Sequence, residues 1–289
     1  MILLIDAGNS RIKWRMLEMP RQGILGQQYR CGVVQSSAAA ELARAWQGCR
    51  CQSVVVSCVA NDAVHSALAQ AIAGVVSADE SNVAVHWLRP EREKYGLINR
   101  YAAPEKLGAD RYAALIAAAR LRVGNCVVVS VGTATTIDAL SLRDNQQSEF
   151  LGGEFMGGEF MGGVILPGPA MMRAALLQGT GQIERKMVTA VPPVQASSLA
   201  FSQDTFSQAI FPQDTAAAVE SGIVLAQVGA VHAMRDRMTQ ADAAPPLVIL
   251  TGGARGEIRD GLQAELIDIE DLVLEGLAWI ALESEVASR

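Results

Sequence analysis

One pattern occurs twice in this sequence and constrains the fold more than any other feature: an apolar strand, a short turn of small polar residues and a second strand. Residues 1–5 are apolar, residues 6–10 read Asp-Ala-Gly-Asn-Ser, and apolar residues then alternate with basic ones over residues 12–16. Residues 126–142 repeat the pattern, with a turn rich in glycine and threonine. A continuous apolar run is typical of a buried strand, and alternation indicates a strand with one buried face. The repetition predicts two related halves of the chain.

Helical patterns lie between and after these strands. Asp214 is the predicted N-cap of one of them, because aspartate is favoured at that position. The predicted helices are residues 38–48, 62–73, 107–122, 170–178, 214–238 and 272–287. Strands that alternate with helices are typical of an α/β fold. The chain of 289 residues is long enough for two medium-sized domains. We therefore predict an N-terminal domain of residues 1–124, a C-terminal domain of residues 125–289 and a cleft between them.

Composition and charge exclude several classes of partner. The formal net charge is −6, which provides no basic field for nucleic acid or for an anionic membrane surface. The apolar N-terminal residues have no basic leader and are too few for a signal peptide. No apolar run reaches the roughly 18 residues that span a bilayer. We expect a soluble, cytoplasmic protein that binds neither nucleic acid nor a membrane.

The first turn carries the residue types of a phosphate and metal site. A carboxylate at the end of a buried strand, here Asp6, can hold Mg²⁺, usually through water. Gly8 lets a phosphate approach the main chain, and Asn9 and the N–H groups of the turn can donate to phosphate oxygens. Lys13 supplies a positive charge. The alternative is an ordinary hairpin turn, since Asp, Asn and Gly are common turn residues.

The second turn reads Gly132-Thr133-Ala134-Thr135-Thr136 and follows a buried strand. Its glycine and hydroxyls alone are a weak phosphate signal. Because it takes the same place in the second half as the first turn does in the first, the two turns together could grip a triphosphate from both sides. The sequence has neither a GxxxxGK[ST] pattern nor a GxGxxG pattern after a strand, which disfavours a P-loop or Rossmann site.

A third segment, Gly108-Ala109-Asp110-Arg111, stands at the predicted start of a helix. An aspartate there is usually a cap or a partner of the helix dipole. The alternative is a general base that accepts the proton of an alcohol during phosphoryl transfer. Arg111 beside it could then hold a substrate carboxylate through two hydrogen bonds.

Residues 150–164 contain three near-copies of a five-residue unit, FLGGE, FMGGE and FMGGV. Five residues suit neither a solenoid nor a heptad, and the six glycines argue against a regular helix. We expect a surface loop. The alternative is a functional acidic loop that uses Glu154 and Glu159.

Six segments resemble, in order, the motifs of the type III pantothenate kinases, and they span nearly the whole chain. They are residues 6–10 with Lys13; Tyr101, Pro104 and Leu107-Gly108-Ala109-Asp110-Arg111; residues 132–138; residues 150–153, resumed by residues 164–168; Asp214-Thr215 with Ser221-Gly222; and Thr251-Gly252-Gly253 with residues 272–277.

The resemblance implies an α/β fold of two duplicated actin-like (ribonuclease H-like) domains with mixed sheets flanked by helices. It also implies a homodimer that uses ATP to phosphorylate pantothenate, the first step of coenzyme A synthesis. Asp110 corresponds to the general base. The positions that correspond to the ATP site are Asp6, Ala7, Gly8, Asn9, Ser10, Arg11, Ile12, Lys13 and Thr133, with Mg²⁺ at Asp6. Those that correspond to the pantothenate site are Tyr101, Gly108, Ala109, Asp110, Arg111 and Thr215, the last from the other subunit.

Two departures from the family pattern bear on function. Many members carry an aspartate that binds K⁺ or NH₄⁺ where this chain has Ser130, and a neutral hydroxyl is a weaker ligand for such a cation. The glycine-rich motif is interrupted by ten residues, 154–163, which are two added copies of the repeat. These departures motivate one alternative, a nucleotide-binding regulatory or accessory protein with weak or no kinase activity. The other is a kinase of the same fold that acts on another small alcohol.

Overall fold

The computed structural model describes residues 1–18, 27–75, 83–142, 157–179, 211–241 and 244–287. Contacts divide the chain into two compact units. Unit 1 comprises residues 1–124, 140–162 and 271–289, and unit 2 comprises residues 125–139 and 163–270. The C-terminal helix, which was predicted as part of the second domain, thus belongs with the N-terminal residues. The assignment of the two units as duplicated domains stays a prediction.

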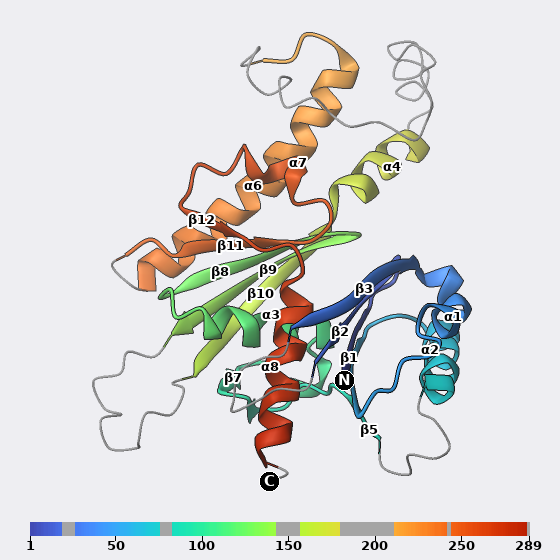
Figure 1. Cartoon of the computed structure of the whole chain (residues 1–289). Helices are drawn as coiled ribbons and strands as arrows, with labels where there is room; N and C mark the ends of the chain where they lie inside the picture. The colour runs from blue at the N-terminus through green and yellow to red at the C-terminus, as the bar shows by residue number, and fades with distance from the viewer. Residues whose placement is uncertain (19–26, 76–82, 143–156, 180–210, 242–243, 288–289) are drawn as a thin grey trace, which may run out of the picture. The chain divides into compact units, whose positions relative to one another are not determined.

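Unit 1 is built on a five-stranded mixed sheet with the strand order β3-β2-β1-β4-β5 (Figure 1). The apolar N-terminal run forms its central strand, which is antiparallel to β2 and parallel to β4. Residues on both faces of this strand are buried, because helices cover both sides of the sheet. The strands are β1 (Ile2–Ala7), β2 (Arg11–Leu17), β3 (Gln28–Gln35), β4 (Ser53–Cys58) and β5 (Ala84–Trp87).

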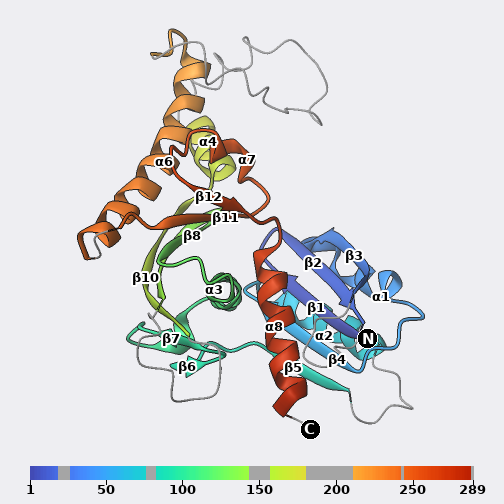
Figure 2. The ribbon, with the colours of Figure 1, turned by 60° about the vertical axis from the view of Figure 1, so that its left-hand side comes forward.

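Helices pack on the two faces of this sheet (Figures 1 and 2). One face shares a core with η1 (Ser36–Glu41), α1 (Leu42–Ala45) and α2 (Asp62–Val75). The other face is covered by α3 (Ala109–Arg120) and α8 (Leu272–Ala287). The single helix predicted at 38–48 is instead a 3₁₀ helix, kinked at Ala38, followed by one α-helical turn. No side chain caps the start of either piece, which removes a common stabiliser of a regular helix start.

The helices α3 and α8 approach each other closely because their facing residues are small. Half of the 12 residues of α3 are alanines, and all of these alanines are buried. A Cβ atom on Gly276 of α8 would lie 1.9 Å from the main-chain oxygen of Ala113. Only glycine fits at this crossing.

The third copy of the repeat lies in a strand, so the prediction of a surface loop was wrong there. Gly158–Pro167 form β10, whose first residues pair in parallel with β7 (Leu97–Asn99), and β7 pairs with β6 (Glu93–Lys94). The glycines have a packing reason, since a Cβ atom on Gly157 would lie 1.8 Å from the oxygen of Gly96. Residues 150–156, with Glu154, lie outside the described residues.

The second sheet has seven strands in the order β12-β11-β8-β9-β10-β7-β6 (Figure 1). Unit 2 contributes β8 (Cys126–Val131), β11 (Leu247–Thr251), β12 (Leu266–Asp268), the second half of β10 and most of β9 (Ala134–Leu142). β9 begins earlier than predicted, so the second turn is only Gly132 and Thr133. The helices α4 (Pro169–Gly179), α6 (Thr215–Ala241) and α7 (Gly256–Arg259) are tied together by Arg173, which donates to Glu220 (2.6 and 2.7 Å) and Glu257 (3.2 Å).

Helix α6 is the longest helix described, with 27 residues. As predicted, Asp214 caps it, accepting a hydrogen bond of 2.9 Å from the N–H of Ala217. A window of 18 residues within 215–239 has a mean hydropathy of 1.3, and the helix is long and apolar enough to cross a membrane by length and composition alone. A single helix of this kind is weak evidence for a span, and it leaves apolar side chains exposed, including Leu225 at 63%.

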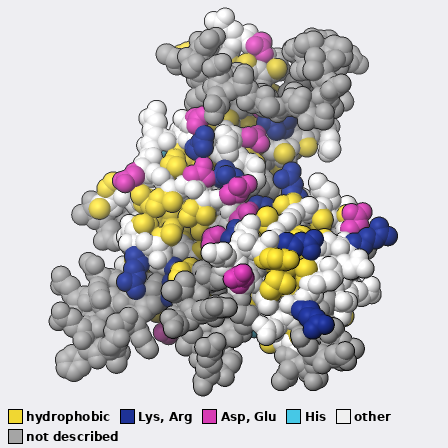
Figure 3. All heavy atoms as spheres, viewed as in Figure 1, with side chains coloured by type: hydrophobic (Ala, Val, Ile, Leu, Met, Phe, Trp, Pro, Cys, Tyr) yellow, Lys and Arg dark blue, Asp and Glu magenta, His cyan; other side chains and the backbone are white. Residues whose placement is uncertain are grey.

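Charged side chains are mixed on the face that Figure 3 shows. Lys and Arg are interspersed there with Asp and Glu, rather than gathered into one field. This arrangement fits the net charge of −6.

Candidate active site

The first turn is held rigidly at the end of β1. The N–H of Gly8 donates to the oxygen of Arg11 (3.0 Å), which closes the turn. Ser36, at the start of η1, donates through Oγ to the oxygen of Gly8 (2.7 Å) and through its N–H to the oxygen of Ser10 (3.0 Å). Asn9 and Ser10 are exposed at the tip. Sequence reasoning missed Ser36, because its role depends on a contact between distant segments.

Ala7, Ile12 and Arg11 take different places around this turn. The side chains of Ala7 and Ile12 are fully buried in the core. These two residues could contact a nucleotide only through their main chain. Arg11 is exposed.

Asp6 lies between a lysine and a serine on neighbouring strands. It is in register with Lys13 of β2 and with Ser57 of β4, and side chains in register lie on the same face of a sheet. Burial raises the pKa of Asp6 to about 7, the charges of Asp110 and Asp271 add to this, and Lys13 opposes it. Ser57 is fully buried, and its hydroxyl has no hydrogen-bond partner.

This neighbourhood fits a divalent cation. A cation favours the ionised form of Asp6, and Mg²⁺ is usually held by one or two carboxylates together with substrate phosphates and water. The buried Ser57 hydroxyl would gain a partner in that hydration shell. Among the described residues there is no group of three His, Cys, Asp or Glu side chains that could hold a metal without such help.

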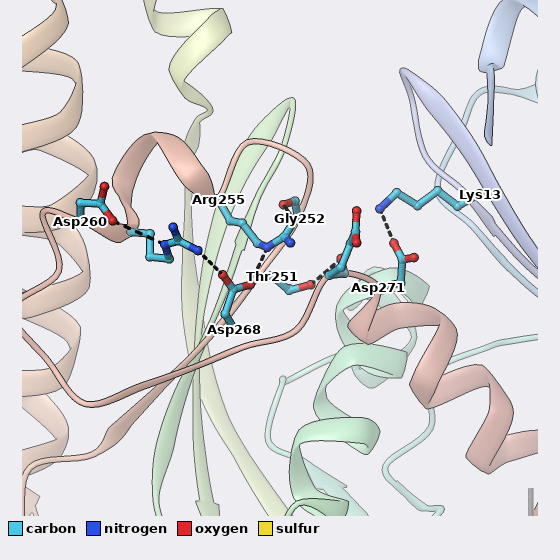
Figure 4. A network of polar contacts seen from close by, with 9 residues as sticks. Lys13, Thr251, Gly252, Arg255, Asp260, Asp268 and Asp271 are labelled. Atoms are coloured by element: carbon cyan, nitrogen blue, oxygen red, sulfur yellow. Dashed lines mark hydrogen bonds and ion pairs between the residues drawn. The ribbon is translucent and has the colours of Figure 1, made fainter. Parts of the chain in front are cut away.

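Two ion pairs fasten β2 to the start of α8. The ammonium of Lys13 contacts the carboxylate of Asp271, and the two side chains point toward each other in Figure 4. Arg15 pairs with Glu275 at 2.5 Å. Residues two apart on a strand and four apart on a helix have similar spacings. Lys13 and Arg15 can therefore each face one of the two acidic side chains. Neither acidic residue was predicted as part of the site.

Asp110 is the second residue of α3, and its carboxylate lies close to Gly108, the N-cap of the helix. A Cβ atom on Gly108 would lie 2.5 Å from Oδ1 of Asp110. The same oxygen accepts a hydrogen bond of 2.8 Å from the N–H of Arg111. Burial raises the pKa of Asp110, although the N–H and the charge of Arg111 oppose the change. Because Asp110 also raises the pKa of Asp6, the fold brings the two carboxyl groups within electrostatic reach of each other.

Arg111 lies against two aromatic rings, those of Tyr101 and Phe160, whose centres are 5.2 Å apart. It is 7% exposed, and its Cζ lies 5.6 Å from the ring centre of Tyr101 and 5.7 Å from that of Phe160. Its Nη1 donates to the hydroxyl of Tyr101 at 3.0 Å. Phe160 was not predicted as a site residue.

The place of Phe160 corrects the interpretation of the repeat. Residues 160–168 read FMGGVILPG, so the third copy continues the motif without interruption, and β10 holds it in one strand. The added residues therefore precede the motif. This could have been found in the sequence by aligning the motif with the last copy rather than the first.

The other predicted residues belong to unit 2. Thr133 is exposed in the second turn, where a Cβ atom on Gly168 would lie 2.0 Å from the oxygen of Gly132. Ser130 is in register with Thr251, whose hydroxyl donates to the oxygen of Glu270 at 3.2 Å. Thr215 is the first residue of α6. In the same unit, Arg255 reaches Gly252 and Asp268 (Figure 4).

Comparisons with known proteins agree with these motifs. The family model described as type III pantothenate kinase matches residues 2–237. A type III pantothenate kinase of Janthinobacterium sp. (strain Marseille) is 35% identical over 287 residues, which cover 98% of each chain. Another, of Azoarcus sp. (strain BH72), is 33% identical over 97% of this chain and 90% of its own length.

A solved structure shows the fold. A Sinorhizobium meliloti protein described as a 2-dehydro-3-deoxygalactonokinase superposes with a TM-score of 0.53 at 13% identity, over 99% of each chain. The predicted α/β fold with mixed sheets flanked by helices is confirmed. With its sequence matched over nearly its whole length, the chain belongs to the type III pantothenate kinase family.

Proposed function

We propose that this protein transfers the γ-phosphoryl group of ATP to the hydroxyl of pantothenate and so makes 4′-phosphopantothenate, the first step of coenzyme A synthesis. The observation that carries this proposal is the pair of carboxyl groups with raised pKa values, Asp6 and Asp110. One lies beside Lys13, and the other precedes the guanidinium of Arg111. The names of the curated relatives support pantothenate as the acceptor.

Asp110 is the proposed general base. Its carboxylate accepts the proton of the substrate hydroxyl, the hydroxyl oxygen forms a bond to the γ-phosphorus, and the bond from that phosphorus to the bridging oxygen breaks as ADP leaves. A base with a raised pKa is better matched to neutral pH than an ordinary aspartate. Arg111 and Tyr101 would hold the substrate, with Arg111 on its carboxylate.

The ATP site combines the first turn with a charged neighbourhood. Lys13 and the N–H groups of the turn would offset negative charge on the phosphates. Asp6 and Ser57 would hold a divalent cation, which neutralises phosphate charge when bound. We propose Thr133 as a further ATP-binding residue. Because Ser130 offers only a neutral hydroxyl, we expect activity that does not depend on K⁺ or NH₄⁺.

We further propose a homodimer in which α6 lies at the interface and Thr215 reaches the partner's pantothenate. The exposed apolar side chains of α6 support this, since a 63% exposed Leu225 is better buried against another chain. Because ATP and pantothenate are soluble, we expect the protein in the cytoplasm.

The experiment is an assay of the purified protein with ATP, Mg²⁺ and pantothenate, with and without K⁺ or NH₄⁺, in which phosphopantothenate is detected by mass spectrometry. Absence of product under every condition, from protein shown to be folded, would reject the proposal. A panel of other small alcohols with ADP detection tests the rival acceptor. The regulatory alternative predicts nucleotide binding without turnover, and the joint presence of Asp6, Asp110 and Arg111 speaks against it.

A further inference from the structure

Arg92 gathers the main chain of the segment that carries Tyr101. Residues 100–103 have no regular structure between β7 and the short helix η2 (Pro104–Lys106). The guanidinium of Arg92 donates to the oxygens of Asn99 (2.9 Å), Tyr101 (2.8 Å) and Ala102 (3.2 Å). One side chain thus fixes three carbonyl groups of a segment that has no ladder of its own.

Asn99 anchors the same segment from the inside. Its side chain is fully buried; Nδ2 donates to the oxygen of Pro104 (3.1 Å) and Oδ1 accepts from the N–H of Tyr101 (3.1 Å). Its own N–H donates to the oxygen of Arg92 at 2.9 Å. Buried amides require partners. The partners of Asn99 named here belong to Tyr101, Pro104 and Arg92.

Both main-chain polar groups of Tyr101 take part in these bonds. Its N–H donates to Asn99, and its carbonyl oxygen accepts from Arg92. The Tyr101 hydroxyl is an acceptor for Arg111, and its ring faces the Arg111 guanidinium. If the segment moved, this largely buried guanidinium would lose both contacts.

We propose that Arg92 and Asn99 are positioning residues for the acceptor substrate, because they fix Tyr101, and through it Arg111, in the binding arrangement before pantothenate arrives. The inference rests on the proposed function in one respect, that Tyr101 and Arg111 contact pantothenate. A segment ordered in advance does not have to be ordered on binding. Loss of the anchor should therefore weaken pantothenate binding and leave ATP binding unchanged.

The test compares Arg92→Lys and Asn99→Ser with the wild-type protein. A lysine keeps the charge but has no fork that reaches three carbonyls. We expect an increase of about tenfold in the KM for pantothenate, the effect of roughly one lost net hydrogen bond. The KM for ATP should stay within about twofold, below the effect of a lost hydrogen bond. Arg235→Lys is the matched control, because Arg235 also donates to a main-chain oxygen, that of Pro246 (2.9 Å), in unit 2.

A merely structural role predicts something else: a lower Tm and a lower kcat with both KM values unchanged. That result, or equal changes in the two KM values, would overturn the inference. Arg92 is exposed, so Arg92→Lys decides the question even if Asn99→Ser does not fold. Failure of the proposed function is separate, since wild-type protein would then make no phosphopantothenate.

Discussion

At the residue scale, the first prediction concerns Asp110, the proposed general base. Asp110→Asn keeps the shape of the side chain and removes the base. We expect kcat to fall by at least ~10²-fold, the usual scale for a lost acid–base group. The wild-type rate should fall with decreasing pH as Asp110 takes up a proton, at a higher pH than for an ordinary aspartate because burial raises its pKa. Steady-state kinetics over pH test this, with Asp62→Asn, an exposed aspartate at the start of α2, as control. Near-wild-type turnover of Asp110→Asn would refute the assignment.

Asp6 makes a second residue-scale prediction, which concerns stability without ligands. Its pKa is about 7 in the folded protein, against an ordinary value of 3.8. The folded state therefore favours the protonated form, so this contribution to stability is complete below pH 3.8 and is lost as the pH rises through about 7. Because asparagine does not ionise, the Asp6→Asn variant should not show this loss of stability as the pH rises.

We compare the free energy of unfolding of Asp6→Asn with that of the wild type at two pH values. The difference should favour the variant more at pH 8 than at pH 5. At about 1.4 kcal/mol for each pKa unit, the two units between pH 5 and a pKa of about 7 set an upper limit of about 3 kcal/mol, reduced because Asp6 is only partly buried. Urea unfolding at both pH values, without nucleotide or metal, measures the difference. Identical pH dependence in the two proteins would contradict the raised pKa.

At the element scale, the helix pair α3–α8 tests how closely the fold is packed. Gly276→Ala should destabilise the protein, because the new methyl group meets the oxygen of Ala113. Overpacking of this kind typically costs about 1–3 kcal/mol. Gly74→Ala is the matched control in α2, where nothing lies within 4 Å of the place that a Cβ atom would take. It should stabilise the helix by up to about 1 kcal/mol. Thermal unfolding distinguishes the two, and equal Tm changes would contradict the close approach.

The elements also show what the sequence could and could not predict. Local patterns were enough for β1, β8 and α8, because apolar runs and helical periodicity are properties of neighbouring residues. Ser57, Phe160 and Asp271 were missed, since each joins the site through pairing or packing between segments far apart in the chain. The repeat misled for another reason: three near-identical copies give the motif more than one alignment, and only the last copy continues into the rest of the motif without interruption.

At the scale of the whole molecule, the prediction concerns the dimer. A charged side chain in place of Leu225 would be costly at an apolar interface. We expect Leu225→Glu to convert a dimer into a monomer, measured by light scattering after gel filtration, and to reduce kcat/KM for pantothenate because the partner's Thr215 is lost. Leu121→Glu is the control, since Leu121 is also exposed (39%) but belongs to unit 1. A wild-type monomer, or a dimer that survives Leu225→Glu, would contradict the interface.

Mixing subunits tests whether the site is shared. Asp110→Asn and Thr215→Ala damage different parts of one site, and each homodimer carries the same defect in both sites. A mixed dimer has one site with both defects and one site with neither, if Thr215 comes from the partner. Random exchange would then restore about a quarter of the sites, because half of the dimers are mixed. If Thr215 instead served its own subunit, every site would keep one defect and mixing would restore nothing, so the recovered activity distinguishes a shared site from two independent ones.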